Sequence, residues 1–337
     1  MVRVLIAGLI AMVVSIVIGP KFIEFLRRNE LGQPIREEGP AGHVVKQGTP
    51  VMGGLLILIC ALIPFVALSS FSLEALTVLF ITIACGTLGF IDDFIKLRHR
   101  RSLGLPGRWK MLGLVAITAV TAIAVRQLDG VGTDVYIPIA DVNPDLSWLF
   151  YVLLFFVIAG AANGVNLTDG LDGLAAGTGI IALLTFMAMN VIAYIRSSTE
   201  VELRDVGKLD LAILGAALIG GAIGFLWYNA FPAELFMGDT GSMAIGGALA
   251  GFSIVTGTEA LLVLIGGIFL IEALSVMIQV FTFKYMNRRV FLMTPIHHHF
   301  EMKAWSETKI MVRFWILGAI FCACGFVLYY RYYLRFR

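Results

Sequence analysis

Residues 210–228 read DLAILGAALIGGAIGFLWY, a run of apolar and small residues that opens on a single aspartate. Helical residues rise 1.5 Å each, so about 20 of them cross the hydrocarbon core of a bilayer. The run is long enough for that, and it predicts a membrane-spanning helix. The glycine pair Gly220/Gly224, like Gly247/Gly251 further on, is spaced four residues apart, a spacing that favours close packing of helices.

The rest of the chain follows the same pattern. Of its 337 residues 59% are hydrophobic and only 14% are charged, which leaves too little polar surface to cover a water-soluble core. This composition excludes a soluble enzyme, a nucleic-acid-binding protein, a disordered scaffold and a secreted disulfide-linked module. We predict a single all-α polytopic membrane domain over residues 1–337, with about ten transmembrane helices near 2–20, 51–69, 74–91, 111–127, 147–162, 174–195, 210–228, 242–257, 259–282 and 311–330.

Basic residues gather in the loops on one side of these helices. If the helices alternate in direction, that side receives loops 21–50, 92–110, 163–173, 229–241 and 283–310. We predict that it faces the cytoplasm, since basic loops stay inside, and that both termini are external. The C-terminal arginines Arg331, Arg335 and Arg337 argue against this placement of the C-terminus. In the external segment 128–146, the alternation over 135–139 predicts a small β-hairpin.

The chemically unusual residues lie in the same basic loops. FIDDFIK, residues 90–96, sets Asp92 and Asp93 at the end of the third run, where two adjacent carboxylates cost free energy unless a cation compensates them. In NLTDGLDG, residues 166–173, Asn166, Asp169 and Asp172 are three apart and would share one face of a helical turn. Two more segments complete the set, with Asn229, Phe236 and Asp239 in one and His297, His298 and His299 in the other.

Carboxylates with glycine neighbours and without cysteine suit a hard cation, so the sequence favours Mg²⁺. Zinc is disfavoured, because three consecutive histidines point in different directions on any regular element. Asp169 or Asp239 alone would be explained as a helix cap or a solvated loop charge. Their coincidence on one face indicates a site. For Glu272, inside the ninth run, pairing within the bundle and contact with a substrate route are left open.

With these motifs, and with GTPVMGG at 48–54, MGDTGS at 237–242 and TPIHHHFE at 294–301, the chain resembles the polyprenyl-phosphate N-acetylhexosamine-1-phosphate transferases. The histidine motif is similar to that of the branch acting on muramoyl-pentapeptide. The resemblance implies ten helices, a Mg²⁺-dependent active site facing the cytoplasm of a bacterial plasma (inner) membrane, and a homodimer. The implied reaction moves phospho-N-acetylmuramoyl-pentapeptide from UDP-N-acetylmuramoyl-pentapeptide to undecaprenyl phosphate, releasing UMP and forming lipid I for peptidoglycan.

The resemblance also implies roles for individual residues. Asp239, Asp92 and Asp93 are expected as metal ligands, with Asp92 or Asp93 also as the base. His298 is expected to act in catalysis, and His297 and His299 to steady the diphosphate or the muramoyl group. Phe236 can stack on a base, and asparagines can hydrogen-bond its edge. The other expected substrate contacts are Lys46, Asn166, Leu167, Asp169, Asp172, Asn229, Lys96 and Lys110.

Two alternatives stay open. A sister enzyme that transfers N-acetylglucosamine-1-phosphate would share the aspartates, and the histidine motif discriminates the two. A secondary transporter would also have about ten spans, but it should carry its ionisable residues near the bilayer midplane. These motifs do not decide whether the transfer is direct or passes through a covalent enzyme intermediate, and we predict the direct route.

Overall fold

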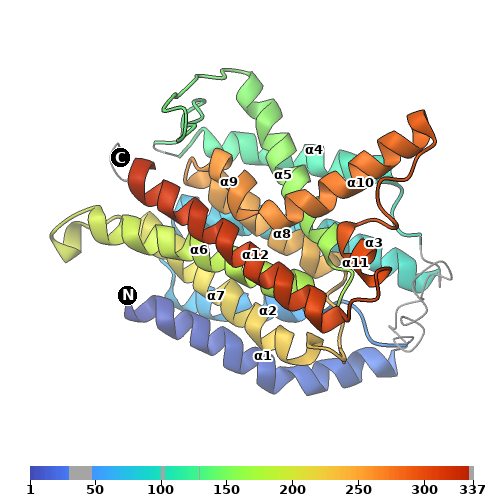
Figure 1. Cartoon of the computed structure of the whole chain (residues 1–337). Helices are drawn as coiled ribbons and strands as arrows, with labels where there is room; N and C mark the ends of the chain where they lie inside the picture. Colours follow the sequence, from blue (N-terminus) through green and yellow to red (C-terminus); the bar gives the residue numbers. More distant parts are fainter. Residues whose placement is uncertain (30–47, 100–102, 129, 334–337) are drawn as a thin grey trace.

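The computed structural model describes residues 1–29, 48–99, 103–128 and 130–333 (Figure 1). It is a bundle of helices and confirms the predicted all-α membrane class. The helices are α1 (Val2–Arg28), α2 (Gly53–Leu68), α3 (Leu73–Arg98), α4 (Gly107–Val125), α5 (Leu149–Thr168), α6 (Leu174–Arg196), α7 (Val206–Asn229), α8 (Gly238–Val255), α9 (Glu259–Ile265), α10 (Gly267–Met286), α11 (Ile296–Glu301) and α12 (Glu307–Leu328), with short turns η2 (Val201–Leu203) and η3 (Tyr329–Tyr333).

Eight of the described helices are long and apolar enough to cross a membrane. They are α1, α3, α4, α5, α6, α7, α10 and α12, and α2 is a shorter apolar helix of 16 residues. The expected number of ten crossings therefore stays a prediction. The first turn of α1 and the last turns of α12 lie at the same end of the bundle, opposite α11 (Figure 1). This arrangement agrees with termini on one side, and the compartment they face stays a prediction.

The two central helices are buried almost all round. In α7, 83% of the membrane-spanning window is buried, and in α8 every residue from Thr240 to Val255 is buried. Small residues allow this packing, as predicted. A Cβ at Gly220 would lie 2.1 Å from the carbonyl oxygen of Gly8 in α1, and one at Gly247 would lie 2.9 Å from that of Ile81 in α3. The bundle is thus built around α7 and α8.

The ninth predicted helix is not continuous. α9 ends at Ile265, α10 begins at Gly267, and Gly266 joins them. α10 then runs toward the right of Figure 1, and much of its length is exposed. The prediction of one helix over 259–282 was wrong. The apolar pattern continues through the break, and hydropathy alone does not reveal a change in the direction of the chain.

The predicted external hairpin is present only in reduced form. Residues 134–137 and 142–145 are joined by two isolated antiparallel bridges, Asp134 with Asp145 and Ile137 with Val142. No regular strand forms in the part of the chain that the structure describes. The segment is a short paired turn, and it lies at the end of the bundle opposite α11 (Figure 1).

Candidate active site

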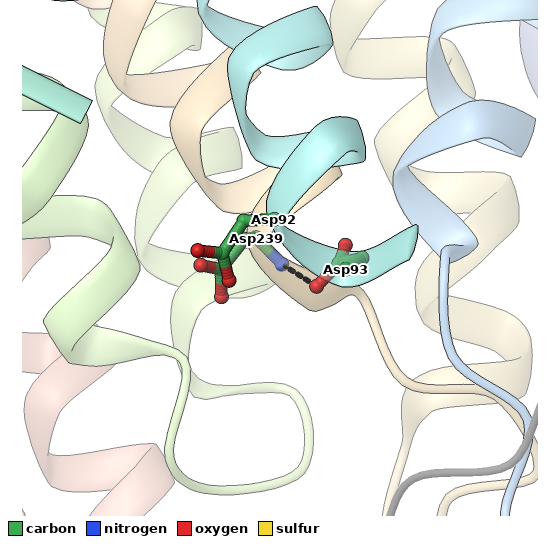
Figure 2. Close-up of side chains that lie close together, drawn as sticks. All are labelled: Asp92, Asp93 and Asp239. Carbon is green, nitrogen blue, oxygen red and sulfur yellow. Dashed lines mark hydrogen bonds between the residues drawn. The ribbon is translucent and has the colours of Figure 1, made fainter. Parts of the chain in front are cut away.

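Three aspartates meet where the end of α3 reaches the start of α8 (Figure 2). Asp92 and Asp93 are buried in the last turns of α3, and Asp239 is in the first turn of α8. Each offers a carboxylate oxygen, and these three oxygens lie within 4.8 Å of one another. Among the described residues, this is the group of acidic, histidine or cysteine side chains that could hold a metal ion.

Asp93 caps the helix that carries Asp239. Its carboxylate accepts hydrogen bonds from the backbone N–H of Thr240 at 2.9 Å, from the Thr240 hydroxyl at 2.7 Å and from the backbone N–H of Asp239 at 3.1 Å. A carboxylate at a helix N-terminus accepts hydrogen bonds from N–H groups that have no partner within the helix, and its negative charge interacts favourably with the helix dipole. The helices approach closely because Gly89 has no side chain, since a Cβ there would lie 2.1 Å from the Asp239 carbonyl oxygen.

Two lysines lie among the carboxylates. Lys96 Nζ is 2.5 Å from Asp92 Oδ2 and 3.0 Å from Asp239 Oδ1. Lys110 Nζ, from α4, is 3.0 Å from Asp92 Oδ1 and 2.8 Å from Asp239 Oδ2. Both ammonium groups therefore bridge Asp92 and Asp239. The two lysines expected as anion contacts belong to the centre of the site, and they partly neutralise its acidic charge.

The 163–173 segment lies beside this cluster. Asn166 donates a hydrogen bond to the Ser242 hydroxyl at 3.0 Å, which ties α5 to α8, and Leu167 is half-buried one residue later. Burial, with repulsion from Asp239, Asp93 and Asp172, raises the pKa of Asp169 to about 8. Asp169 therefore interacts electrostatically with the aspartate cluster, which is consistent with its belonging to the same site.

Asn166, Asp169 and Asp172 do not share a helical face. α5 ends at Thr168, so Asp172 lies beyond it. The Asp172 carboxylate accepts a hydrogen bond at 3.0 Å from the backbone N–H of Ala233 in the segment between α7 and α8. The helical expectation failed because the glycines at 170 and 173 end the helix, and the i, i+3 spacing does not reveal that end.

Asn229 also joins segments. Its side-chain oxygen accepts from the Gly173 N–H and its amide donates to the Leu235 carbonyl, both at 2.9 Å. Both ends of the amide are thus engaged within the protein. Phe236 is held by its backbone, which pairs with Pro50 and Gly53 at 2.8 Å each, and its side chain is half-buried. Lys46 lies outside the described residues.

The three histidines occupy different environments on α11. His297 is fully buried and its Nδ1 lies 3.1 Å from Glu272 Oε1 on α10. His298 is partly exposed and bonds to Glu301, and the ring of His299 accepts from the Leu292 N–H at 3.1 Å. A Cβ at Gly170 would lie 2.2 Å from His297 Nε2, so α11 contacts the 163–173 segment directly.

Several partners in the site were not predicted from the sequence. Thr240 and Ser242 belong to the MGDTGS motif, but a hydroxyl residue next to an aspartate is typical of a helix cap, so their contacts with site residues were not predicted. Glu272 was left undecided, and the structure pairs it with the histidine motif. A carboxylate within an apolar run was the available signal, but its partner lies 25 residues away along the chain.

The sequence comparisons agree with this geometry. Residues 75–257 match the family described as glycosyl transferase family 4. A phospho-N-acetylmuramoyl-pentapeptide-transferase of Halalkalibacterium halodurans is 46% identical over 324 residues, covering 95% of each chain. Proteins of the same name from Rubrobacter xylanophilus and Bacillus subtilis are 46% identical (98% of each chain) and 43% identical (94% of this chain, 95% of the relative). This chain therefore belongs to glycosyl transferase family 4 and, within it, to the family of those transferases.

Proposed function

We propose that this protein transfers phospho-N-acetylmuramoyl-pentapeptide from its UDP carrier to undecaprenyl phosphate, forming lipid I and UMP. The observation that carries the proposal is the cluster of three aspartates and two lysines at one end of a membrane-embedded bundle. One substrate is a soluble anion and the other a lipid, so they can meet only at the membrane surface. The names of the relatives support the substrate. The aspartates and lysines of the cluster lie together at helix ends, whereas a transporter should carry its ionisable residues near the bilayer midplane.

The aspartate cluster fits a Mg²⁺ ion. Mg²⁺ prefers carboxylate oxygens and usually holds substrate phosphates as well. Asp239, Asp92 and Asp93 would hold it, with Asp239 the most open of the three. When bound, the ion would neutralise negative charge on the diphosphate of the nucleotide sugar. Asp93 has a second task, because its hydrogen bonds to Asp239 and Thr240 fix the start of α8.

The lysines suit a reaction that moves negative charge. Lys96 and Lys110 each bring an ammonium group to the carboxylates that would hold the metal, so they also lie within reach of a phosphate bound there. Positive groups arranged before the reaction stabilise charge that develops on phosphate oxygens. The acceptor lipid phosphate is largely ionised already, with a second pKa of about 6, so it needs little help from a base. Asp92 is our candidate for removing the remaining proton.

The neighbouring residues are proposed to bind the rest of the nucleotide sugar. The half-buried Phe236 ring would stack on uracil, with Lys46, Asn166 and Leu167 around the uridine. Asp172 and Asn229 would act by holding the 163–173 and 229–241 segments together, given their backbone bonds. Asp169 would face the metal or the sugar, and His298 and His299 the diphosphate or the muramoyl group.

The same reasoning gives the cellular setting. We propose that the site faces the cytoplasm at the bacterial inner membrane, because the motifs share their side with the basic loops. A homodimer is also proposed, on family resemblance alone.

A transfer assay tests the function. Purified protein in detergent receives radiolabelled UDP-N-acetylmuramoyl-pentapeptide or UDP-N-acetylglucosamine, each with undecaprenyl phosphate and Mg²⁺. We expect butanol-extractable label only from the muramoyl substrate, and none with Asp239→Asn at equal protein. Label from N-acetylglucosamine alone would assign the sister activity instead.

A further inference from the structure

Glu272 is a fully buried carboxylate in an apolar helix. It is the acidic residue of α10, and neither it nor His297 has exposed surface. A charge in such a place is costly unless it is paired. The pairing is the contact between Glu272 Oε1 and His297 Nδ1 at 3.1 Å. An ionised carboxylate only accepts, so we assign the hydrogen of this bond to Nδ1 of the His297 imidazole.

This hydrogen bond fixes the orientation of the His297 ring. With Nδ1 turned to α10, the opposite edge of the ring faces the 163–173 segment, where Gly170 covers Nε2. Nε2 is buried and has no hydrogen-bond partner among the residues that the structure describes. His297 is therefore closed off from a substrate in this structure, whereas His298, with its ring 4.1 Å away, is partly exposed.

Apolar contacts alone would hold α11 without fixing its register. Leu171 and Leu174 pack with Ile268 of α10 and with Ile310 and Phe314 of α12, and Ile296 and Phe300 of α11 lie against them. Burial of apolar surface is not directional. The Glu272–His297 bond, one helical turn from Ile268, adds direction, because only one rotation of α11 lets Nδ1 reach Oε1.

We propose that Glu272 is a positioning residue for the transferase: through His297 it docks α11 against α10 and the 163–173 segment, and so presents His298 to the substrate. His297 is the anchor of the histidine motif, and His298 is its substrate-facing member. The inference rests on the proposed function for its effect on turnover, whereas the docking of α11 does not depend on it.

A double-mutant cycle tests the pairing. Glu272→Leu removes the acceptor, and we expect kcat to fall at least about tenfold, since small misplacements of a reacting group are costly, with a smaller change in KM for the UDP substrate. Glu272→Gln keeps a carbonyl that accepts from Nδ1 and should recover most of the rate. In a His297→Leu background, Glu272→Leu should cost less than about twofold, because coupled residues are not additive. Equal losses in both backgrounds, or a Gln variant as slow as the Leu variant, would overturn the proposal.

Hydrogen exchange gives a readout that does not need activity. Glu272→Leu should speed amide exchange in peptides covering 296–301 and leave peptides from α7 unchanged. Ser275→Ala is the matched control, because it removes a buried side-chain bond from the same helix, Ser275 Oγ to the Glu272 carbonyl at 2.7 Å, without touching α11. Unchanged exchange at 296–301 in Glu272→Leu would refute the docking role. If the wild type shows no transfer but exchange responds as expected, the proposed function fails and the docking stands.

Discussion

Asp92 and Asp93 are neighbours in the sequence with different surroundings. The Asp93 carboxylate accepts hydrogen bonds from backbone and hydroxyl groups at the start of α8, whereas the Asp92 carboxylate forms ion pairs with the two lysines. Asp92 also accepts from the Leu105 N–H at 2.8 Å. The adjacent carboxylates are therefore compensated by separate means, and Asp92 is the better placed to exchange a lysine for another cation or a proton.

Lysine and metal should compete for the same oxygens. Lys110 Nζ contacts Asp92 and Asp239, two of the proposed ligands. Lys110→Met removes that positive charge, so we expect Mn²⁺, as a probe for Mg²⁺, to bind about tenfold more tightly without nucleotide, a change of about 1.4 kcal/mol. Electron paramagnetic resonance of free Mn²⁺ measures this, with Lys309→Met as the control. Weaker binding to the Lys110 variant would contradict the competition.

Asp169 should make stability depend on pH. Its pKa of about 8 in the folded protein lies above its ordinary value near 4, so the folded state keeps a proton that the unfolded state loses. The contribution of the protonated Asp169 side chain to the free energy of unfolding is fully present below about pH 4. It is lost as the pH rises through about 8. Asp169→Asn stays neutral, so its melting temperature advantage over wild type should widen between pH 5 and pH 8 in EDTA and detergent. A constant difference would exclude the raised pKa.

At the scale of helices, the site depends on the close approach of the α3 and α8 backbones. Gly89→Ala would set a methyl group 2.1 Å from the Asp239 carbonyl oxygen, forcing α3 and α8 apart. Overpacking of this kind costs about 1–3 kcal/mol. We expect a lower melting temperature in detergent and a marked loss of transfer, because Asp92 and Asp239 separate. Gly160→Ala in α5 is the control, because no atom of the described part of the chain would lie within 4 Å of the added methyl group. If the Gly89 variant behaves like the Gly160 variant, the close approach is not needed.

The same scale shows what the sequence could predict. Hydropathy located the long helices, and the acidic motifs located the carboxylates, because both signals are local along the chain. The break at Gly266, the Asn229 bridge and the Glu272–His297 pair were missed. Each depends on which segments meet in space, and in an apolar chain with many glycines no periodic pattern specifies that.

For the whole molecule, we propose an orientation in the membrane that labelling can measure. The motif-bearing segments should all face the cytoplasm, because basic loops and acidic motifs coincide. In a Cys324→Ser background, which removes the exposed cysteine, Gly107→Cys should react with an impermeant maleimide only in inverted vesicles. Thr199→Cys, in the segment between α6 and α7, should react in whole spheroplasts. The reverse labelling would invert the orientation.

We propose that Asp92, Asp239 and the two lysines catalyse direct transfer of phospho-N-acetylmuramoyl-pentapeptide from the UDP-linked diphosphate to the lipid phosphate. The attacking phosphate is already anionic, so a covalent enzyme intermediate would gain little. Quench-flow of the enzyme with labelled UDP-N-acetylmuramoyl-pentapeptide, Mg²⁺ and no lipid tests this most directly. We predict no release of UMP until undecaprenyl phosphate is added. A burst of UMP equal to the enzyme concentration, with label retained on the protein, would exclude direct transfer and assign a carboxylate nucleophile instead.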